Sequence, residues 1–374
     1  MNRTVEKGKT LLVDGPASVA LFSGKAEVFG FLIKDMRRIV IREGKRLPFA
    51  VQETARFELS VGADGGVGEV EGNTIPQSWG TAYDMLREIQ KKPATVMVFG
   101  GSDSGKTSFC TYLINRLVSE KHKVAVLDGD LGQSDVGPPC TAAYAYADKP
   151  VTDLFDLKPA NTFFVGVNSP SGAVDRTIEG VAFLKAEILA EATADFVIVN
   201  TDGWGGVEEA VQFKARLAAA VGPDVVFCLQ GEETPSFCAS LGDALAEFRQ
   251  ERAESPVAVL ERNREKRRDL RVLGYAKYLE NGRVKVYALN HLTVEGKENN
   301  ALIWQRRAEN LLVGLYDQKK KFLGIGILRE VDYTRKAIKV FTAVEEKPAF
   351  VFFGKMRLDE NLHEIPEKTV ELKS

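Results

Sequence analysis

The chain has 374 residues, of which 44% are hydrophobic and 27% are charged, proportions that are typical of a soluble globular protein. This length predicts two or three domains with sizeable cores. The formal net charge of −2 excludes a uniformly basic surface, so any nucleic acid would have to bind to a local patch.

The cysteines and the apolar runs indicate the cellular compartment in which the protein is expected. The four cysteines contain no C-x-x-C pair, which argues against a zinc site or a disulfide framework and favours a reducing compartment. The first residues lack the apolar core of a signal peptide, and no apolar run is long enough to cross a bilayer. We therefore expect a cytoplasmic protein with no membrane segment.

Residues 1–78 are predicted to form an all-β domain. Short apolar runs such as 26–33 and 55–61 are separated by turn signals, which is the spacing of a small sandwich or barrel. No chemical constellation stands out in this segment. It is interpreted as a docking or nucleotide-covering module, and a purely structural role stays open.

Residues 79–271 are predicted to form a P-loop kinase domain of the α/β class. After a linking helix, strands and helices alternate. The predicted strands are 94–99, 123–127, 162–167, 196–200, 225–229 and 257–260, and the predicted helices are 108–120, 173–192, 207–221 and 236–252. Near-continuous apolar strands between helices predict a mostly parallel sheet covered on both faces. Ligands of such folds bind beyond the carboxyl ends of the strands.

The strongest motif follows the first of these strands. Residues 100–107 fit G-x-x-x-x-G-K-[ST] between a strand and a helix, the context in which backbone N–H groups hold a β-phosphate. Lys106 would reach the β- and γ-phosphates, and the Thr107 hydroxyl would ligate Mg²⁺. The predicted ATP-binding residues are Gly100, Ser102, Asp103, Ser104, Gly105, Lys106, Thr107 and Ser108.

Two carboxylates, Asp128 and Asp130, follow the next strand. One can serve the metal while the other accepts a proton from an attacking hydroxyl. The alternative is an ordinary Asp-Gly turn.

Two loops and one basic run complete the candidate site. The polar loop 166–172 is typical of a turn that caps the next helix. Trp204 lies among small residues after a strand, where it would either stack on a base or pack over the sheet edge. Six of the eleven residues in 261–271 are basic, which indicates either a solvated helix face or a lid that contacts phosphate. Residues 272–374 are predicted to form a small β-rich domain, beginning with a strand at 275–279.

With these residues in view, the chain resembles the polynucleotide 5′-hydroxyl kinase family. That family includes the eukaryotic RNA kinase of pre-mRNA cleavage and tRNA-splicing complexes, nucleolar pre-rRNA-processing relatives and archaeal homologues. The resemblance covers the whole chain and is carried by the P-loop, by D-x-D-x-G-Q at 128–133 and by T-x-G-W at 201–204. It implies ATP- and Mg²⁺-dependent phosphorylation of the 5′-hydroxyl end of RNA or DNA.

The resemblance also assigns roles to residues. Asp130 becomes the general base, which leaves Asp128 with Thr107 for the metal. Trp204 would stack on the first base with Ser169 opposite, and Gln133 and Thr201 belong to the same RNA-binding set. The lid pattern R-x-x-x-R places Arg264 and Arg268 beside Lys106 as catalytic residues. The pair Arg267 and Arg271 fits the same spacing.

Two other classes stay open. One is a non-catalytic ATP-binding scaffold of an RNA-processing complex, which the intact set of Lys106, Thr107 and Asp130 disfavours. The other is a P-loop ATPase or small-molecule kinase, against which Trp204 and the arginine run count. The sequence does not distinguish RNA from DNA ends, because contacts to 2′-hydroxyls leave no motif.

Overall fold

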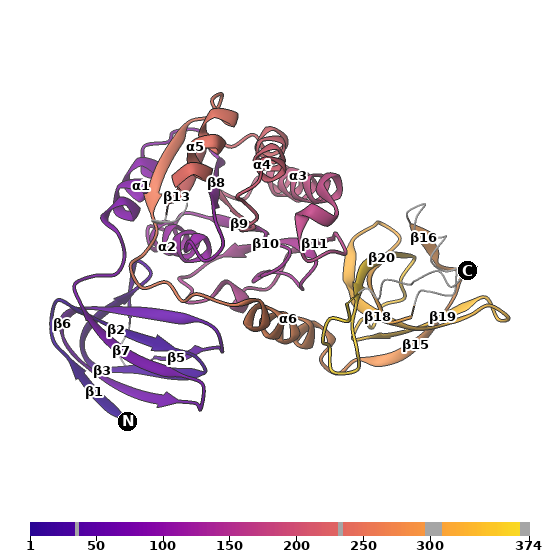
Figure 1. Cartoon of the computed structure of the whole chain (residues 1–374), viewed down its shortest axis with the longest axis horizontal. Helices are drawn as coiled ribbons and strands as arrows, with labels where there is room; N and C mark the ends of the chain where they lie inside the picture. Colours follow the sequence, from indigo (N-terminus) through magenta and orange to yellow (C-terminus); the bar gives the residue numbers. More distant parts are fainter. Residues whose placement is uncertain (34–36, 231–234, 296–308, 367–374) are drawn as a thin grey trace.

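The computed structural model describes residues 1–33, 37–230, 235–295 and 309–366. Figure 1 shows an N-terminal sheet, a central layer of helices and strands, and a C-terminal sheet, with helix α6 running from the central part toward the last. No helix in these ranges is long and apolar enough to span a bilayer.

The N-terminal part is all β, as predicted. Its strands form one seven-stranded sheet in which the long strands β3 and β6 pair antiparallel. Buried residues alternate with exposed ones along much of β6, the period of a strand with one face on a core. The strands are β1 (Asn2–Val5), β2 (Lys9–Asp14), β3 (Ala17–Val28), β4 (Phe31–Leu32), β5 (Arg38–Ile41), β6 (Arg46–Val61) and β7 (Gly66–Glu71).

The central sheet confirms the predicted α/β class. Its strand order is β11-β10-β9-β12-β8-β13-β14. Strand β10 runs antiparallel to its neighbours β9 and β11, and the other neighbouring strands pair parallel. The strands are β8 (Ala94–Gly100), β9 (Val124–Gly129), β10 (Thr141–Ala147), β11 (Asn161–Phe164), β12 (Phe196–Thr201), β13 (Val225–Gln230) and β14 (Gln250–Glu254). The helices are α1 (Gln77–Arg87), α2 (Lys106–Ser119), α3 (Val174–Glu191), α4 (Glu208–Val221) and α5 (Pro235–Ala244), with short 3-10 turns at Leu154–Asp156 and Pro170–Gly172.

The N-terminal sheet and the P-loop helix α2 share a hydrophobic core. Trp79 of α1 makes edge-to-face contacts with Phe109 and Tyr112 of α2. The buried Asn115 amide of α2 donates to the Phe29 carbonyl oxygen of the N-terminal domain at 2.9 Å. The helix that begins at the P-loop is therefore fixed against the first domain as well as against its own sheet.

Two predicted elements of the central domain are wrong. Residues 236–252 are not one helix, because α5 ends at Ala244 and Gln250–Glu254 form strand β14. This edge strand is largely charged and exposed, so only its parallel pairing with β13 marks it as a strand. Residues 257–260 form a loop rather than a strand, and Val259 and Leu260 line the cavity above the P-loop.

The predicted strand at 275–279 is also wrong. Those residues complete helix α6 (Arg264–Leu279), whose buried positions Leu270, Gly274, Tyr275 and Leu279 follow a helical period. The predicted domain limit at 271 and 272 falls inside this helix.

After α6 comes a six-stranded C-terminal sheet of order β15-β19-β18-β17-β20-β16. It agrees with the predicted β-rich domain. Its strands are β15 (Arg283–Ala288), β16 (Thr293–Glu295), β17 (Leu311–Tyr316), β18 (Phe322–Asp332), β19 (Ala337–Thr342) and β20 (Phe350–Arg357).

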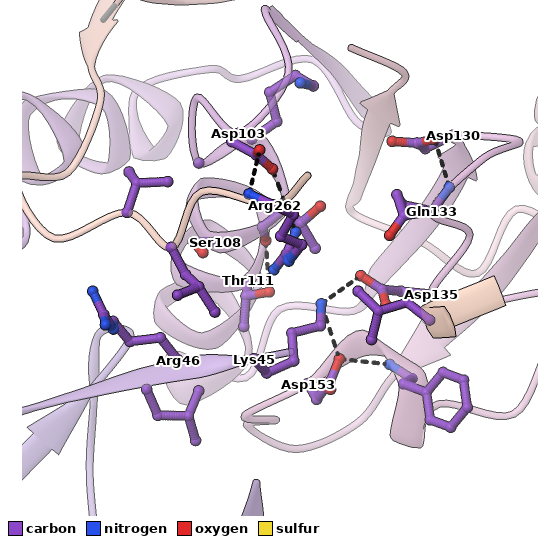
Figure 2. A pocket seen from close by; sticks show the side chains of 18 of the residues that line it. Lys45, Arg46, Asp103, Ser108, Thr111, Asp130, Gln133, Asp135, Asp153 and Arg262 are labelled. Carbon is purple, nitrogen blue, oxygen red and sulfur yellow. Dashed lines mark hydrogen bonds and ion pairs between the residues drawn. The ribbon is translucent and has the colours of Figure 1, made fainter. Parts of the chain in front are cut away.

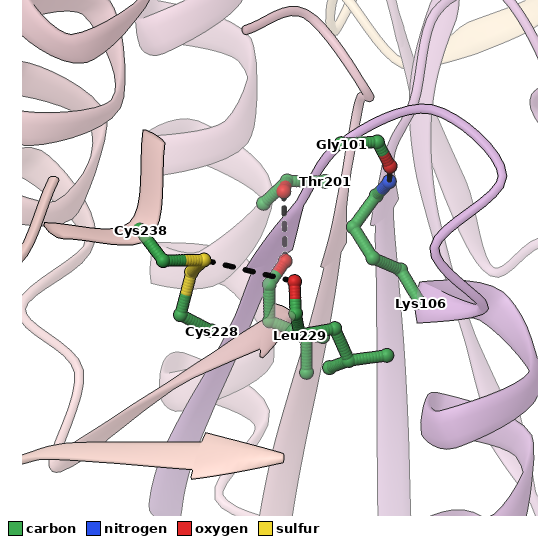
Figure 3. The surroundings of a disulfide bond; sticks show 7 residues. Gly101, Lys106, Thr201, Cys228, Leu229 and Cys238 are labelled. Carbon is green, nitrogen blue, oxygen red and sulfur yellow. Dashed lines mark hydrogen bonds between the residues drawn. A yellow bond between two sulfur atoms is a disulfide. The ribbon is translucent and has the colours of Figure 1, made fainter. Parts of the chain in front are cut away.

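One pair of cysteines overturns the expectation that the chain has no disulfide. Cys228 of β13 is bonded to Cys238 of α5, with 6.2 Å between their Cα atoms, while Cys110 and Cys140 are free and buried. The spacing of ten residues carried no signal, because only the packing of α5 on the sheet brings the two thiols together. Figure 3 shows the disulfide beside Leu229 of β13. Strand β13 pairs with β8, the strand that leads into the P-loop, and Cys228 lies in register with Phe99 of β8.

The disulfide predicts a thiol count. Protein unfolded in guanidinium without reductant should release two reactive thiols per chain, those of Cys110 and Cys140, and four after reduction. A thiol-reactive chromophore gives both numbers. Four reactive thiols before reduction would contradict the bond.

Candidate active site

The P-loop is shaped to surround an anion. Strand β8 is buried along its whole length, and Gly105 begins α2 at φ +88°, a left-handed conformation that favours glycine. A Cβ there would lie 2.7 Å from Pro256 Cδ. The Ser104 Oγ is buried without a hydrogen-bond partner among the described residues and lies against Gly100, where a Cβ would approach it to 2.6 Å, and Ser104 is not one of the residues that line the cavity.

Lys106 lies in the same loop and is buried. Its ammonium group donates to the Gly101 carbonyl oxygen at 2.6 Å, as Figure 3 shows. Burial lowers the pKa of Lys106 to about 8, against a smaller opposing effect of Asp130. A phosphate placed in the loop would therefore meet a cation that little water screens.

Asp128 is buried at the end of β9. Its Oδ1 accepts hydrogen bonds from Asp130 N at 3.2 Å and Asn200 Nδ2 at 3.0 Å. Its Oδ2 accepts from Asp135 N at 2.7 Å and Val136 N at 3.2 Å. Burial, with the carboxylates of Asp135 and Asp130, raises the pKa of Asp128 to about 7. This side chain holds the loop and does not line the cavity.

Asp130 does line the cavity. Its Oδ1 accepts from Gly132 N at 3.0 Å and Gln133 N at 2.9 Å, and its Oδ2 accepts no hydrogen bond from the described residues. Burial and the nearby Asp202 carboxylate raise its pKa. A fixed carboxylate with a raised pKa and a free oxygen is suited to accept a proton.

The cavity has walls from the N-terminal domain, the P-loop and the start of α6 (Figure 2). Lys45 donates to Asp135 at 2.8 Å and lies 3.6 Å from Asp153. Arg42 contacts the same two carboxylates. Arg46 pairs with Asp14 through two hydrogen bonds of 2.6 and 2.8 Å. These cations are held by nearby acids on the side of the cavity that the first domain forms.

The arginine run reaches the P-loop through Asp103. The Asp103 carboxylate accepts from Arg262 N at 3.0 Å and from an Arg267 amino group at 2.7 Å. Arg262 also donates to the Gly44 carbonyl oxygen at 3.0 Å, which joins the run to the N-terminal domain. Arg262, Arg267 and Arg271 line the cavity.

The two predicted lid residues lie elsewhere. Arg264 and Arg268 are exposed and do not line the cavity, because the helical turn of α6 directs them away from the P-loop. The structure therefore brings the alternative pair, Arg267 and Arg271, to the cavity.

The predicted RNA-binding residues divide into two groups. Gln133 lines the cavity, and its amide donates to the Arg267 carbonyl oxygen at 3.1 Å. Thr201, Trp204 and Ser169 do not line it. The Thr201 hydroxyl is buried and donates to the Val98 carbonyl oxygen at 2.7 Å. The Ser169 hydroxyl is hydrogen-bonded to that of Ser171 at 2.9 Å.

Trp204 is half-buried, with its ring 5.6 Å from that of Phe213. The preceding Gly203 packs closely on Ser102, since a Cβ there would lie 2.8 Å from Ser102 Cα. The T-x-G-W loop thus lies directly beside the P-loop, although the indole itself is partly engaged in packing.

Sequence reasoning missed a buried ion pair behind this loop. Lys214 of α4 is fully buried and donates to the Asp202 carboxylate at 2.6 Å and to its carbonyl oxygen at 2.8 Å. The other Asp202 oxygen accepts from Trp204 N at 2.7 Å. One signal was available: helical spacing places Lys214 on the buried face of α4 with Val211 and Ala218.

The residues of the cavity fit Mg²⁺ as an ion shared with substrate. The Thr107 hydroxyl, which belongs to the cavity lining, supplies a hard oxygen donor of the type that Mg²⁺ prefers. No group of three or more His, Cys, Asp or Glu side chains in the described part of the chain could hold a metal by itself. Such an ion would complete its shell with phosphate oxygens and water. Asp128, whose oxygens already accept hydrogen bonds, would act on it only through water.

The chain is similar to several known proteins. Residues 100–281 match the family model described as mRNA cleavage and polyadenylation factor CLP1 P-loop. A polyribonucleotide 5′-hydroxyl-kinase of Pyrococcus horikoshii is 27% identical over 78% of this chain and 93% of its own length. Another, from Methanocaldococcus jannaschii, is 25% identical over 78% of this chain and 94% of its own length. The structure of a Clp1p–Pcf11p complex contains a chain of the same fold, with a TM-score of 0.77 at 14% identity, covering 96% of this chain and 97% of that one.

The lowered pKa of Lys106 predicts a pH dependence of ATP binding. In the free protein this ammonium loses its proton as the pH rises through about 8. If phosphate binding needs the charged form, ATP affinity should be full below that pH and fall by up to about tenfold per pH unit above it. Titration with ATP at pH 7.5 to 9.5 measures this.

The control is Lys106→Arg, since a guanidinium stays charged over this range. Its ATP affinity should be weaker but independent of pH. Equal affinities of the wild-type protein at both ends of the range would contradict the assignment.

Proposed function

We propose that this chain, whose central domain belongs to the CLP1 P-loop family, is a kinase that transfers the γ-phosphate of ATP to the 5′-hydroxyl end of RNA. The observation that carries the proposal is the meeting of Lys106, Asp130 and the arginines of α6 around one cavity. Archaeal relatives that are similar over nearly their whole length bear the name polyribonucleotide 5′-hydroxyl-kinase.

The P-loop would bind the phosphates of ATP. Backbone N–H groups at the start of α2 would donate to a bound phosphate. The Lys106 ammonium would leave the Gly101 carbonyl oxygen and contact the β- and γ-phosphates. The Thr107 hydroxyl would hold Mg²⁺ and Asp128 would act on it through water; when bound, such an ion would neutralise phosphate charge.

Asp130 would act as the general base. Its free oxygen would accept the proton of the 5′-hydroxyl. As the proton leaves, the 5′-hydroxyl oxygen would form a bond to the γ-phosphorus of ATP, and the bond between that phosphorus and the β-phosphate oxygen would break. The two backbone N–H groups on the other oxygen keep the carboxylate fixed. A positioned base of this kind contributes about 10²–10⁴-fold to a rate.

Arg267 and Arg271 would act as the lid arginines. Both line the cavity, and Arg267 already reaches the P-loop through Asp103. An arginine so placed stabilises the charge on the transferring phosphoryl group. The exposed positions of Arg264 and Arg268 favour this register over the one first assigned.

The acceptor end would lie between the T-x-G-W loop and the loop after β11. Trp204 would stack on the first base with Ser169 on the opposite side. Because the Thr201 hydroxyl is engaged within the sheet, this residue contributes by placing the loop and not by contacting RNA.

The direct test is phosphate transfer. Incubation with γ-labelled ATP, Mg²⁺ and 5′-hydroxyl oligonucleotides of RNA and DNA should produce labelled 5′ ends, and EDTA should abolish the labelling. ATP hydrolysis without labelled ends would favour an ATPase, and ATP binding without either reaction would favour a scaffold.

Asp130→Asn should keep ATP binding and lose turnover. The amide cannot accept the proton, so kcat should fall by about 10²–10⁴-fold while the ATP dissociation constant stays within about twofold of the wild-type value. Parallel loss of ATP affinity would instead assign Asp130 to the metal.

Trp204→Ala should raise the KM for the oligonucleotide and leave the KM for ATP unchanged. The loss of stacking corresponds to about 1–3 kcal/mol, and Trp204→Phe should recover much of it. Because the ring also packs on Phe213, the melting temperature is measured beside the two KM values. A destabilised variant with an unchanged oligonucleotide KM would refute the stacking role.

A further inference from the structure

A carboxylate from the C-terminal domain lies among residues of the proposed site. Glu364 accepts two hydrogen bonds from Arg271, with Nε–Oε1 and Nη2–Oε2 distances of 2.6 Å each. The two side chains are 9% and 11% exposed. A planar, two-bond pair of this kind fixes the guanidinium in orientation as well as position.

Glu364 also contacts the loop that follows β11. Asn168 Nδ2 lies 3.3 and 3.2 Å from the two Glu364 oxygens, and the Tyr275 hydroxyl donates to Oε1 at 3.2 Å. Asn168 directly precedes Ser169, and its carbonyl oxygen lies against Gly132, where a Cβ would approach it to 2.8 Å. One carboxylate therefore joins α6, the Ser169 loop and the neighbourhood of Asp130.

Backbone hydrogen bonds fix the position of the chain around Glu364. Glu364 forms a β-bridge with Leu358, and Ile365 N donates to the Arg357 carbonyl oxygen at 2.8 Å. In the strand before it, Lys355 N donates to the Gly166 carbonyl oxygen at 2.8 Å. The C-terminal sheet is thereby attached to the same loop, so it can transmit a fixed position to Glu364.

We propose that Glu364 is a positioning residue, which orients Arg271 toward the transferring phosphate and holds the Ser169 loop beside it. The pairing uses Nε and one amino group of Arg271, which leaves the other amino group for the cavity that Arg271 lines. The inference rests on the proposed kinase function. It gives the C-terminal domain a direct role in the geometry of the acceptor side.

The test compares Glu364→Gln with Glu360→Gln. Glu360 is exposed in the same segment, and its side chain forms no hydrogen bond or ion pair with the residues that the structure describes, so its substitution is a matched control. Glutamine keeps the volume of Glu364 but loses the charge and the paired acceptors. We expect kcat for oligonucleotide phosphorylation to fall at least tenfold in Glu364→Gln, with ATP affinity within twofold of wild type, and no change in Glu360→Gln.

A double-mutant comparison separates positioning from folding. If Glu364 acts through Arg271, Glu364→Gln should reduce kcat much less in an Arg271→Ala background than in the wild type. Arg271→Lys, which keeps the charge but lacks the fork, should be as slow as Glu364→Gln. Melting temperatures are measured for all variants, and kcat is compared at a temperature where each is folded.

Three outcomes overturn the inference. They are an unchanged kcat in Glu364→Gln beside an active wild type, a full loss that persists in the Arg271→Ala background, and losses of ATP affinity and kcat in equal measure. The first leaves the proposed function intact. Binding of 5′-hydroxyl oligonucleotides to the wild-type protein is measured by fluorescence anisotropy in the presence of an ATP analogue. If the wild-type protein neither phosphorylates nor binds these oligonucleotides, the proposed function and this inference are both wrong.

Discussion

The buried carboxylate of Asp128 is the contact on which the arrangement of the site depends. It accepts backbone hydrogen bonds from the segment 130–136 and a side-chain hydrogen bond from Asn200 at the end of the neighbouring strand β12. Asn200 also lies 3.4 Å from the Thr107 hydroxyl through the same amide nitrogen. Loss of these hydrogen bonds would leave the buried Asp128 carboxylate without donors, which is strongly disfavoured. The P-loop, the Asp130 loop and the T-x-G-W loop are therefore fixed in position relative to one another.

Around this centre the cavity is completed by polar contacts between domains. Arg42 and Lys45 of the first domain pair with Asp135 and Asp153 of the second, and α6 is attached to the P-loop through Asp103. The buried pair of Arg271 and Glu364 adds the third domain. Buried ion pairs contribute little net stability, but separating the partners leaves an uncompensated charge and is costly. They suit a site whose walls have to adopt one relative position when nucleotide binds.

Features that depend on residues close together in the sequence were predictable, and features that depend on contacts between distant segments were not. The P-loop, Asp130 and the mostly parallel sheet follow from local motifs and from hydrophobic period, both of which act over a few residues. The strand β14 and the disulfide do not, because β14 is charged and is defined only by pairing with β13, and Cys228 meets Cys238 only through the packing of α5. The true extent of α6 was missed because its aromatic residues Tyr275 and Tyr278 also suit a strand.

The sequence by itself determined the residue types of the candidate site: a P-loop, a pair of carboxylates after the next strand and an arginine-rich segment after the sheet. It did so because each of these needs fixed residue types at short spacings along the chain. Only the tertiary structure decided which arginines face the cavity, since the pitch of α6 exposes Arg264 and Arg268 and turns Arg267 and Arg271 inward. It alone paired Lys214 with Asp202 and Glu364 with Arg271. Those side chains are far apart or unremarkable in the sequence, and they pair only because folding brings them together in a buried place, where leaving either charge without its partner would be costly.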